Sequence, residues 1–224
     1  MIFDVMTLFP EMIESVTDQS IIGRAKKANL LTVRTHNIRD FSEDKHRRVD
    51  DTVCGGGFGM LMAPPPICKC YDHVKTLQSG KSICIYLSPK GKVLTQKMAR
   101  SFLEYDNITL LCGHYEGVDQ RVIDSIVDME ISIGDYVLTG GELPACIFID
   151  CVSRMIPGVL PDAECFEDES IASGLLEHPQ YTRPIEFNGM KVPDVLLSGD
   201  HAKIEKWRFE KALEITKKNR PDLL

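Results

Sequence analysis

Three apolar stretches in the middle of the chain each lead directly into a glycine-containing loop. The stretches cover residues 83–87, 108–112 and 131–133, and the loops cover residues 88–91, 113–117 and 134–144. Apolar runs of about five residues are typical of strands buried on both faces, as in a parallel sheet covered by helices. The carboxyl ends of parallel strands lie at one edge of such a sheet, where ligands bind. The pattern therefore predicts three loops that converge on a pocket.

The other apolar positions predict a regular alternation of strands and helices. Residues 2–9 are predicted as a buried strand, and Pro10 stands where a helix would begin. A second strand is predicted around residues 31–35. Helices are predicted around residues 20–28, from Pro64 to about Gly80, from Thr95, around 122–126, from about Pro144 to Pro157 and from about Asp200. This order of elements favours an α/β sandwich with a parallel sheet.

Composition divides the chain into three segments. Residues 1–158 form the predicted α/β domain, and residues 159–173 are an acidic, irregular segment interpreted as a linker or lid. Residues 174–224 begin with several prolines and end in one helix, which predicts a small, mostly helical domain. The apolar residues of that helix are scattered around its circumference, so it is expected to pack on something larger, such as a second subunit.

Bulk composition excludes several classes of protein. The mean hydropathy is −0.10, and no stretch reaches the roughly 18 apolar residues of a membrane span. The first residues contain an early acid and no basic region, which argues against a signal peptide. The eight cysteines contain no CxxC pair, which favours reduced thiols in a cytoplasmic protein and no metal site.

Charge is unevenly distributed along the chain. The net charge of −7 argues against a nucleic-acid partner, because such binding depends on neutralising phosphates. However, residues 201–220 contain seven Lys or Arg against three Glu, and residues 45–48 read Lys-His-Arg-Arg. Residues 162–169 contain five acids and no base. Since charged clusters are often only solvated surface, the charge permits RNA binding without demonstrating it.

Two glycine-rich segments suggest different roles. The run Gly55–Gly59 does not follow a strand, which excludes a dinucleotide fingerprint and leaves a substrate-facing loop or a plain surface loop. The segment Gly134–Pro144 predicts a tight backbone that opens a helix and offers N–H and C=O groups to an adenine edge. Tyr86 stands just before the first loop, and Tyr115 and Tyr136 stand in the other two, either to face a cationic ligand or simply to pack. The loops therefore suit a flat, polar small molecule.

Sequence blocks along almost the whole chain resemble the bacterial tRNA (guanine-N(1)-)-methyltransferase family. The blocks are residues 8–12, 56–60, 86–89, 113–119, 133–144, 153–154, 178–184 and 196–201. The resemblance implies a deep trefoil knot of the SPOUT class and a homodimer whose subunits share each active site. It also implies S-adenosylmethionine as methyl donor, and tRNA methylated on N1 of the guanine immediately 3′ of the anticodon, position 37. Because knotted chains are almost absent among known folds, no pattern predicts the knot.

The resemblance also implies roles for individual residues. Its cofactor-binding positions are Tyr86, Leu87, Ser88, Pro89, Gly113, Tyr115, Glu116, Ser132, Ile133, Gly134, Asp135, Tyr136, Val137, Leu138, Gly140, Gly141 and Pro144. The expected tRNA contacts, which predict a steep loss of affinity with salt, are Lys45, Arg47, Arg48, Arg183, Lys206 and Arg208. Mg²⁺ is a further expectation, with Glu116 as a weak candidate ligand.

The catalytic assignment implied by the resemblance contains two departures from the family pattern. The family arginine maps onto Arg154, and counting back from Ser170 puts the catalytic aspartate on Glu169. Asp168, immediately before it, is the alternative base. A carboxylate can take the proton of guanine N1, and a guanidinium can stabilise the charge that develops on the guanine oxygen. His114 stands where the family usually has Arg or Lys, which predicts slightly weaker binding of RNA or cofactor.

Two other functions compete with this interpretation. The glutamate at position 169 is compatible with a tRNA-binding protein that retains the pocket but has weakened catalysis. A ribose 2′-O-methyltransferase of the same knotted class would instead modify a sugar hydroxyl.

Overall fold

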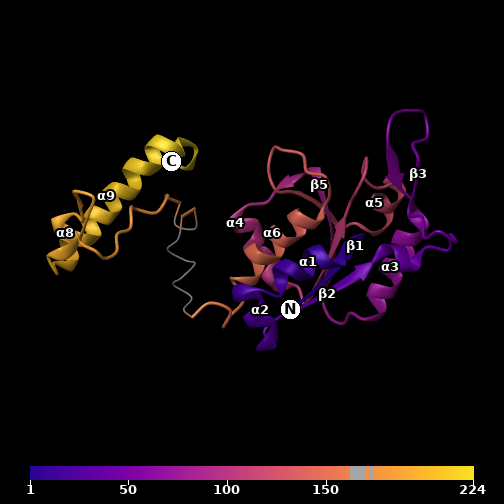
Figure 1. The fold of residues 1–224 in the computed structure, drawn as a ribbon, viewed down its shortest axis with the longest axis horizontal. Helices are drawn as coiled ribbons and strands as arrows, with labels where there is room; N and C mark the ends of the chain where they lie inside the picture. Colours follow the sequence, from indigo (N-terminus) through magenta and orange to yellow (C-terminus); the bar gives the residue numbers. More distant parts are fainter. Residues whose placement is uncertain (162–169, 172–173) are drawn as a thin grey trace. The chain divides into compact units, whose positions relative to one another are not determined.

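The computed structural model describes residues 1–161, 170–171 and 174–224 (Figure 1). The chain forms two compact units, residues 1–162 and 163–224. The boundary between them falls inside the segment 159–173 that composition singled out, and the three-part division itself stays a prediction. The two candidate bases, Asp168 and Glu169, lie outside the described residues.

The first unit is built on a five-stranded, wholly parallel sheet. Its strands, in spatial order, are β2 (Thr32–Asn37), β1 (Ile2–Thr7), β6 (Asn107–Cys112), β5 (Ser82–Val93) and β7 (Met129–Ser132). The predicted α/β class with a parallel sheet is confirmed. The knot stays a prediction.

The register of the central strands brings their carboxyl ends to one edge. Met6 and Tyr86 both pair with Leu111, so the segments that follow β1, β5 and β6 leave the sheet at the same level. All six residues of β6 are buried, as expected for a central strand covered on both faces. The predicted convergence of loops follows from this register.

Strand β5 is longer than its apolar stretch predicts. Residues 88–91 were expected to form a loop, yet β5 continues to Val93. Leu87 and Lys92 both pair with Ile131, so the intervening residues bulge out of the ladder. At Gly91, an added Cβ would collide with the backbone of Glu130, which explains why glycine stands there. This return to the sheet depends on pairing with β7, for which residues 88–93 carry no local signal.

Helices cover both faces of the sheet (Figure 1). On one face lie α1 (Pro10–Thr17), α4 (Gln96–Ser101) and α6 (Glu142–Ser153), joined by contacts such as the Phe102 and Phe148 rings, whose centroids are 5.1 Å apart. On the other face lie α3 (Pro64–Thr76) and α5 (Gln120–Ile126), packed over Met6 and Leu111. The smaller elements are α2 (Ser20–Lys27) and the hairpin of β3 (Asp50–Thr52) and β4 (Met60–Met62).

The second unit contains more structure than the single predicted helix. Its elements are the hairpin β8 (Glu186–Phe187) and β9 (Met190–Lys191), the short helix α8 (Asp194–Leu197) and the long helix α9 (His201–Asn219). Trp207 of α9 packs against the rings of His178 and Tyr181. Leu176 donates its backbone N–H to the Thr216 hydroxyl, at 2.8 Å. None of the helices in the described part of the chain has the length and hydrophobicity needed to cross a membrane.

A buried charge cluster lies under α3 at the centre of β1. Asp4 is fully buried and accepts hydrogen bonds from Arg34, at 2.7 and 2.8 Å, and from Gln78, at 2.9 Å, while His36 Nε2 lies 2.8 Å from its carboxylate. Burial raises the pKa of Asp4, but the hydrogen bonds with His36, Arg34 and Gln78 outweigh it and hold the pKa at about 2. The carboxylate is therefore kept ionised inside the unit.

Acid is expected to remove this contribution to stability. A carboxyl whose pKa is lower in the folded state stabilises the fold fully above its ordinary pKa of about 3.8 and loses that effect as the pH falls toward 2. The effect is worth about 2 kcal/mol at neutral pH, and about half of it is lost by pH 3. Urea unfolding of wild type and Asp4→Asn between pH 3 and 7 measures it: the difference in unfolding free energy should shrink as the pH falls. A difference independent of pH would contradict the prediction.

Candidate functional site

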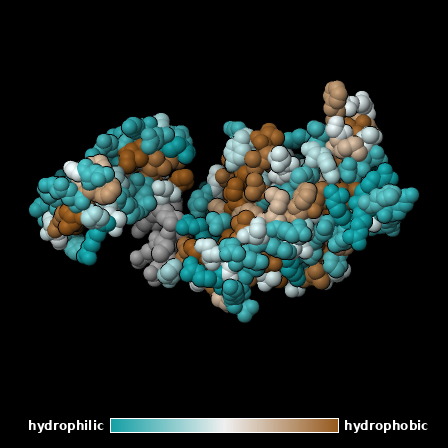
Figure 2. Space-filling model, viewed as in Figure 1, coloured by the Kyte–Doolittle hydropathy of each residue, from teal (hydrophilic) through white to brown (hydrophobic). Residues whose placement is uncertain are grey.

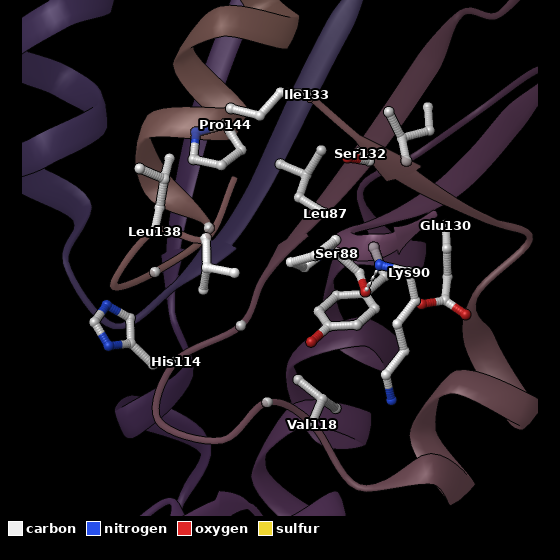
Figure 3. Close-up of a pocket in the computed structure, with 18 of the residues that line it drawn as sticks. Leu87, Ser88, Lys90, His114, Val118, Glu130, Ser132, Ile133, Leu138 and Pro144 are labelled. Atoms are coloured by element: carbon white, nitrogen blue, oxygen red, sulfur yellow. Dashed lines mark hydrogen bonds between the residues drawn. The ribbon is translucent and has the colours of Figure 1, made fainter. Parts of the chain in front are cut away.

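The three predicted loops converge on one cavity of about 370 Å³ at the carboxyl edge of the sheet (Figure 3). Three segments form its walls. They are residues 86–90, where the apolar stretch of β5 ends, residues 113–118 after β6, and residues 130–141, which include most of β7 and the loop after it. Pro144 of α6 completes it. The volume is within the range of small-molecule sites.

All the cofactor-binding residues expected from sequence line this cavity except Asp135. Lining residues that sequence reasoning did not assign to it are Leu61, Lys90, His114, Gly117, Val118, Gln120, Ile123, Glu130, Ile131 and Thr139. Most of these are neighbours of assigned residues in the same segments. Leu61, Gln120 and Ile123 come instead from β4 and α5, which no sequence pattern connects to the loops.

The loop after β6 is held in place by backbone hydrogen bonds. Gly117 donates its N–H to the carbonyl of His114, at 3.0 Å, which closes a turn. Tyr115 has a φ of 59° and Gly117 a φ of 113°, so the turn uses left-handed backbone, which costs energy for a tyrosine. The carbonyl of Gly117 accepts from Met62, and Glu116 donates to Met60. Strand β4 therefore fixes the outer side of this wall.

The paired glycines before α6 close the opposite wall. Gly141 donates its N–H to the carbonyl of Gly113, at 2.9 Å, and Gly140 forms a bridge with His114. A Cβ on Gly141 would lie 2.6 Å from the Cα of Cys112. A Cβ on Gly140 would collide with the His114 ring. Glycine is required at both positions because the two segments approach each other this closely.

The three tyrosines behave differently. Tyr86 is buried against Gly113, and burial raises the pKa of its hydroxyl. Tyr115 and Tyr136 are about half exposed, and the Tyr136 hydroxyl donates to the carbonyl of Ile133, at 3.1 Å. Of the two roles predicted for these tyrosines, Tyr86 therefore has the packing role. The other two offer aromatic surface at the pocket.

Polar groups occupy opposite ends of the cavity (Figure 3). Lys90 and Glu130 lie at one end, and His114 lies at the other beside Leu138. Glu116 adds a second carboxylate to the lining. A pocket with this lining can hold a ligand that carries both positive and negative groups.

The glycine run at 55–59 connects to the pocket at its base. A Cβ on Gly59 would collide with the side chain of Glu116, so the two segments are in contact. Phe58, one residue earlier, is 99% exposed. The run therefore contacts a pocket residue at its base and is exposed near its middle, and its role as a substrate-facing loop stays a prediction.

Among the expected catalytic and RNA-contacting residues of the first unit, Lys45, Arg47, Arg48 and Arg154 do not line the cavity. Arg154 follows α6 directly, at the opposite end of that helix from the pocket. Arg47 and Arg48 are exposed and paired with Asp40 and Asp44. In the second unit, Lys206 and Arg208 are exposed and form ion pairs with Glu210 and Glu205 along α9.

Lys45 and Arg183 complete the expected RNA contacts. Lys45 is exposed in the loop that precedes β3, and Arg183 is exposed on the second unit.

Comparison with known proteins gives one consistent result. A family model described as tRNA (Guanine-1)-methyltransferase TrmD matches residues 1–224. A protein of Ruminiclostridium cellulolyticum named tRNA (guanine-N(1)-)-methyltransferase is 58% identical over 99% of this chain and 95% of its own length. Proteins with the same name from Clostridioides difficile and Lachnospira eligens are 56% and 55% identical, over 99% of this chain and 96% and 94% of their own lengths.

Proposed function

The chain belongs to the tRNA (guanine-1)-methyltransferase family, and we propose that it transfers a methyl group from S-adenosylmethionine to N1 of the guanine immediately 3′ of the anticodon, position 37. Family membership makes it a tRNA-methylating enzyme that uses a methyl donor, and the two alternative functions find no support among the relatives. The convergence of three glycine-bearing loops on one cavity is the observation that supports the choice of donor and its site.

The cavity fits S-adenosylmethionine in three respects. Its volume of about 370 Å³ suits a nucleoside with an amino-acid tail. The glycines at 113, 140 and 141 line the cavity and let its two walls approach each other closely, so main chain rather than side chains borders the space proposed for the adenine. Glu116 and Glu130 supply negative charge for a sulfonium and an ammonium group, and Lys90 supplies positive charge for a carboxylate.

The pocket residues would act by orientation. S-adenosylmethionine supplies a methyl group bound to a positively charged sulfur. In-line displacement at that carbon depends strongly on alignment, so the backbone of Gly140 and Gly141 and the walls at 86–90 and 132–138 would contribute by fixing the donor. An exposed aromatic face such as that of Tyr115 can stabilise a nearby cation by about 0.5–2 kcal/mol.

On the guanine side, the proposed roles follow from the acidity of N1. That nitrogen carries a proton at neutral pH. Glu169, or Asp168 beside it, would accept this proton as guanine N1 attacks the methyl carbon of the donor. Negative charge then develops on the neighbouring guanine oxygen, and the guanidinium of Arg154 would stabilise it.

The length of α6 bears on how these groups meet. The helix begins at Glu142 beside the pocket, and Arg154 follows its last residue. Twelve residues of helix span about 18 Å, since each residue adds about 1.5 Å. Arg154 is thus distant from the pocket of its own chain along the helix axis. We propose that each active site combines the pocket of one subunit with Arg154 of the other.

An exposed apolar face supports a dimer of this kind. Met12 and Val16 of α1 and Leu143 and Ile147 of α6 are 41–50% exposed, and each pair is four residues apart, on one side of its helix. The two helices pack against each other, and Leu143 precedes the pocket residue Pro144, so we propose that these side chains form one surface beside the pocket. Figure 2 shows hydrophobic residues exposed on this face of the first unit. A second copy of the chain is the partner that a shared site requires.

A charge on this face should dissociate the dimer. Ile147→Asp places a carboxylate in the proposed interface, where burying it without a partner is strongly unfavourable. We expect a monomer of about 25 kDa by light scattering and at least a 100-fold loss of methylation. Leu77→Asp is the control, because Leu77 is equally exposed at the end of α3, on the other face of the sheet. An Ile147→Asp dimer with full activity would reject this surface as the interface.

Methylation of defined transcripts tests the proposed function. The protein is incubated with labelled S-adenosylmethionine and tRNA transcripts that carry either guanine or adenine at position 37. Label should appear only with guanine, and nucleoside digestion should return 1-methylguanosine. Ribose-methylated product, or label on the adenine transcript, would reject the proposal.

We also propose Lys45, Arg47, Arg48, Arg183, Lys206 and Arg208 as tRNA contacts. Most of them are well exposed, although Arg47, Arg48, Lys206 and Arg208 are paired with acids, which tRNA phosphates would have to displace. Mg²⁺ stays an expectation from the family resemblance, since a single carboxylate such as Glu116 is a poor basis for a site.

A further inference from the structure

Beneath the paired glycines of the pocket lies a carboxylate to which sequence reasoning assigned no role. We propose that Glu142 is a positioning residue that holds the 113–117 loop and the 140–141 turn in the arrangement that binds the methyl donor. This inference rests on the proposed function, because it concerns the same pocket. Glu142 itself does not line the cavity.

The carboxylate of Glu142 joins three segments that are distant in sequence. It is 1% exposed and stands at the first position of α6. The Thr7 hydroxyl at the end of β1 donates to its Oε1, at 2.6 Å, and the Nε2 atom of His114 lies 3.2 Å from its Oε2. The Thr7 oxygen in turn accepts from the backbone N–H of Phe9, at 2.9 Å. Each carboxylate oxygen is therefore held by a different segment.

This network supports a part of the pocket where two segments approach each other closely. His114 and Gly140 both line the cavity and form a backbone bridge. A Cβ on Gly140 would lie 2.6 Å from Oε2 of Glu142 and would also collide with the His114 ring. The carboxylate thus lies directly behind the turn and fixes the imidazole against it. If the carboxylate moved, the imidazole would lose this support, and the two walls would be held together here by the backbone contacts of Gly140 and Gly141 with His114 and Gly113.

The energetic balance favours a role beyond packing. A buried carboxylate is costly unless it is hydrogen-bonded, and an apolar side chain of similar size would fill the same space at lower cost. The helix N-terminus offsets part of that cost. The ionisable groups facing Glu142 are His114 from the loop, Cys112 from β6 and Cys146 from α6, and its charge contributes, after burial, to the raised pKa of both thiols. The geometry that this carboxylate maintains explains its presence.

The test separates positioning from stability. Thr7→Val removes one donor to the carboxylate, and Glu142→Gln keeps the shape and the acceptor for Thr7 while removing the charge that faces His114. Thr109→Val is the matched control. Thr109 is equally buried in the neighbouring strand β6 and has a side-chain hydrogen bond from Gln78, at 2.8 Å, away from the pocket. Each full-length variant is assayed for the Kd of S-adenosylhomocysteine by calorimetry, for kcat at saturating donor, and for Tm.

We expect Thr7→Val and Glu142→Gln to raise the Kd by about 5- to 30-fold, with kcat changed by less than about threefold. The double variant should bind no more weakly than the weaker single one, because both changes disturb one network. Thr109→Val should lower Tm and leave the Kd unchanged. Unchanged Kd values in both network variants, or an equal rise in the control, would overturn the role of Glu142. If the wild type gives no binding heat, the proposed donor is rejected, and the role of Glu142 with it.

Discussion

Replacing Arg154 with alanine is expected to lower kcat by about 10²- to 10³-fold while leaving donor binding unchanged. The loss is expected because Arg154 is the group proposed to stabilise charge on the guanine oxygen, and deleting a preorganised donor of this kind typically lowers kcat by this factor. Donor affinity should persist because Arg154 follows the last residue of α6, a helix about 18 Å long whose first turn lies at the pocket. Single-turnover methylation and calorimetry measure the two quantities separately.

Mixing two inactive variants shows which subunit supplies the arginine. The second variant is Gly140→Val, whose side chain displaces His114 and so blocks the pocket. After subunit exchange, half of the dimers are hybrids, and each hybrid has one site that combines an intact pocket with an intact Arg154. Activity should return to about a quarter of the wild-type level. No recovery, with hybrids verified by mass spectrometry, would show that Arg154 serves its own chain; unchanged Tm values control for folding.

Glu169→Gln is expected to reduce single-turnover methylation by about 10²- to 10⁴-fold, the usual contribution of a general base. The amide keeps the size of the side chain but cannot accept the proton of guanine N1. Asp168→Asn, one residue away, is the matched control and should retain activity within about threefold. Both variants should bind tRNA and donor as the wild type does, because only proton removal is affected.

The opposite result for these two variants would change which residue is assigned as the general base. An active Glu169→Gln enzyme with an inactive Asp168→Asn enzyme would identify Asp168 as the base and show that the register from Ser170 is misplaced by one residue. If both single variants stay active, neither carboxylate is the base, and proton removal must be assigned elsewhere.

The sequence predicted the sheet and the pocket because both depend on local pattern. The stretches at 83–87 and 108–112 are apolar except for Thr109, a composition typical of strands buried on both faces. Once those strands are parallel, the loops after them must share an edge, so nearly every loop residue expected at the pocket lines it.

The features that sequence missed depend on contacts between distant segments. Residues 88–93 rejoin the sheet because Lys92 and Val93 pair with β7, and Lys92 is not typical of a buried strand. Leu61 reaches the pocket through β4, which packs on the 113–117 loop. Glu142 has the sequence context of an ordinary first-turn acid, and its burial becomes evident only when β1 and the loop are placed around it.

Strand β7 is an edge strand of four residues, yet it pairs with both halves of β5 and carries Ile131 to Ser132 into the wall of the cavity. Edge strands usually open first in native-state fluctuations, and their amides exchange fastest with solvent. In this protein, a bound donor would touch β7. Because β7 pairs with β5 on both sides of the bulge at 88–91, opening of β7 would also release that bulge. Slow hydrogen exchange in β7 should therefore report donor occupancy more sensitively than any amide of the fully buried strand β6.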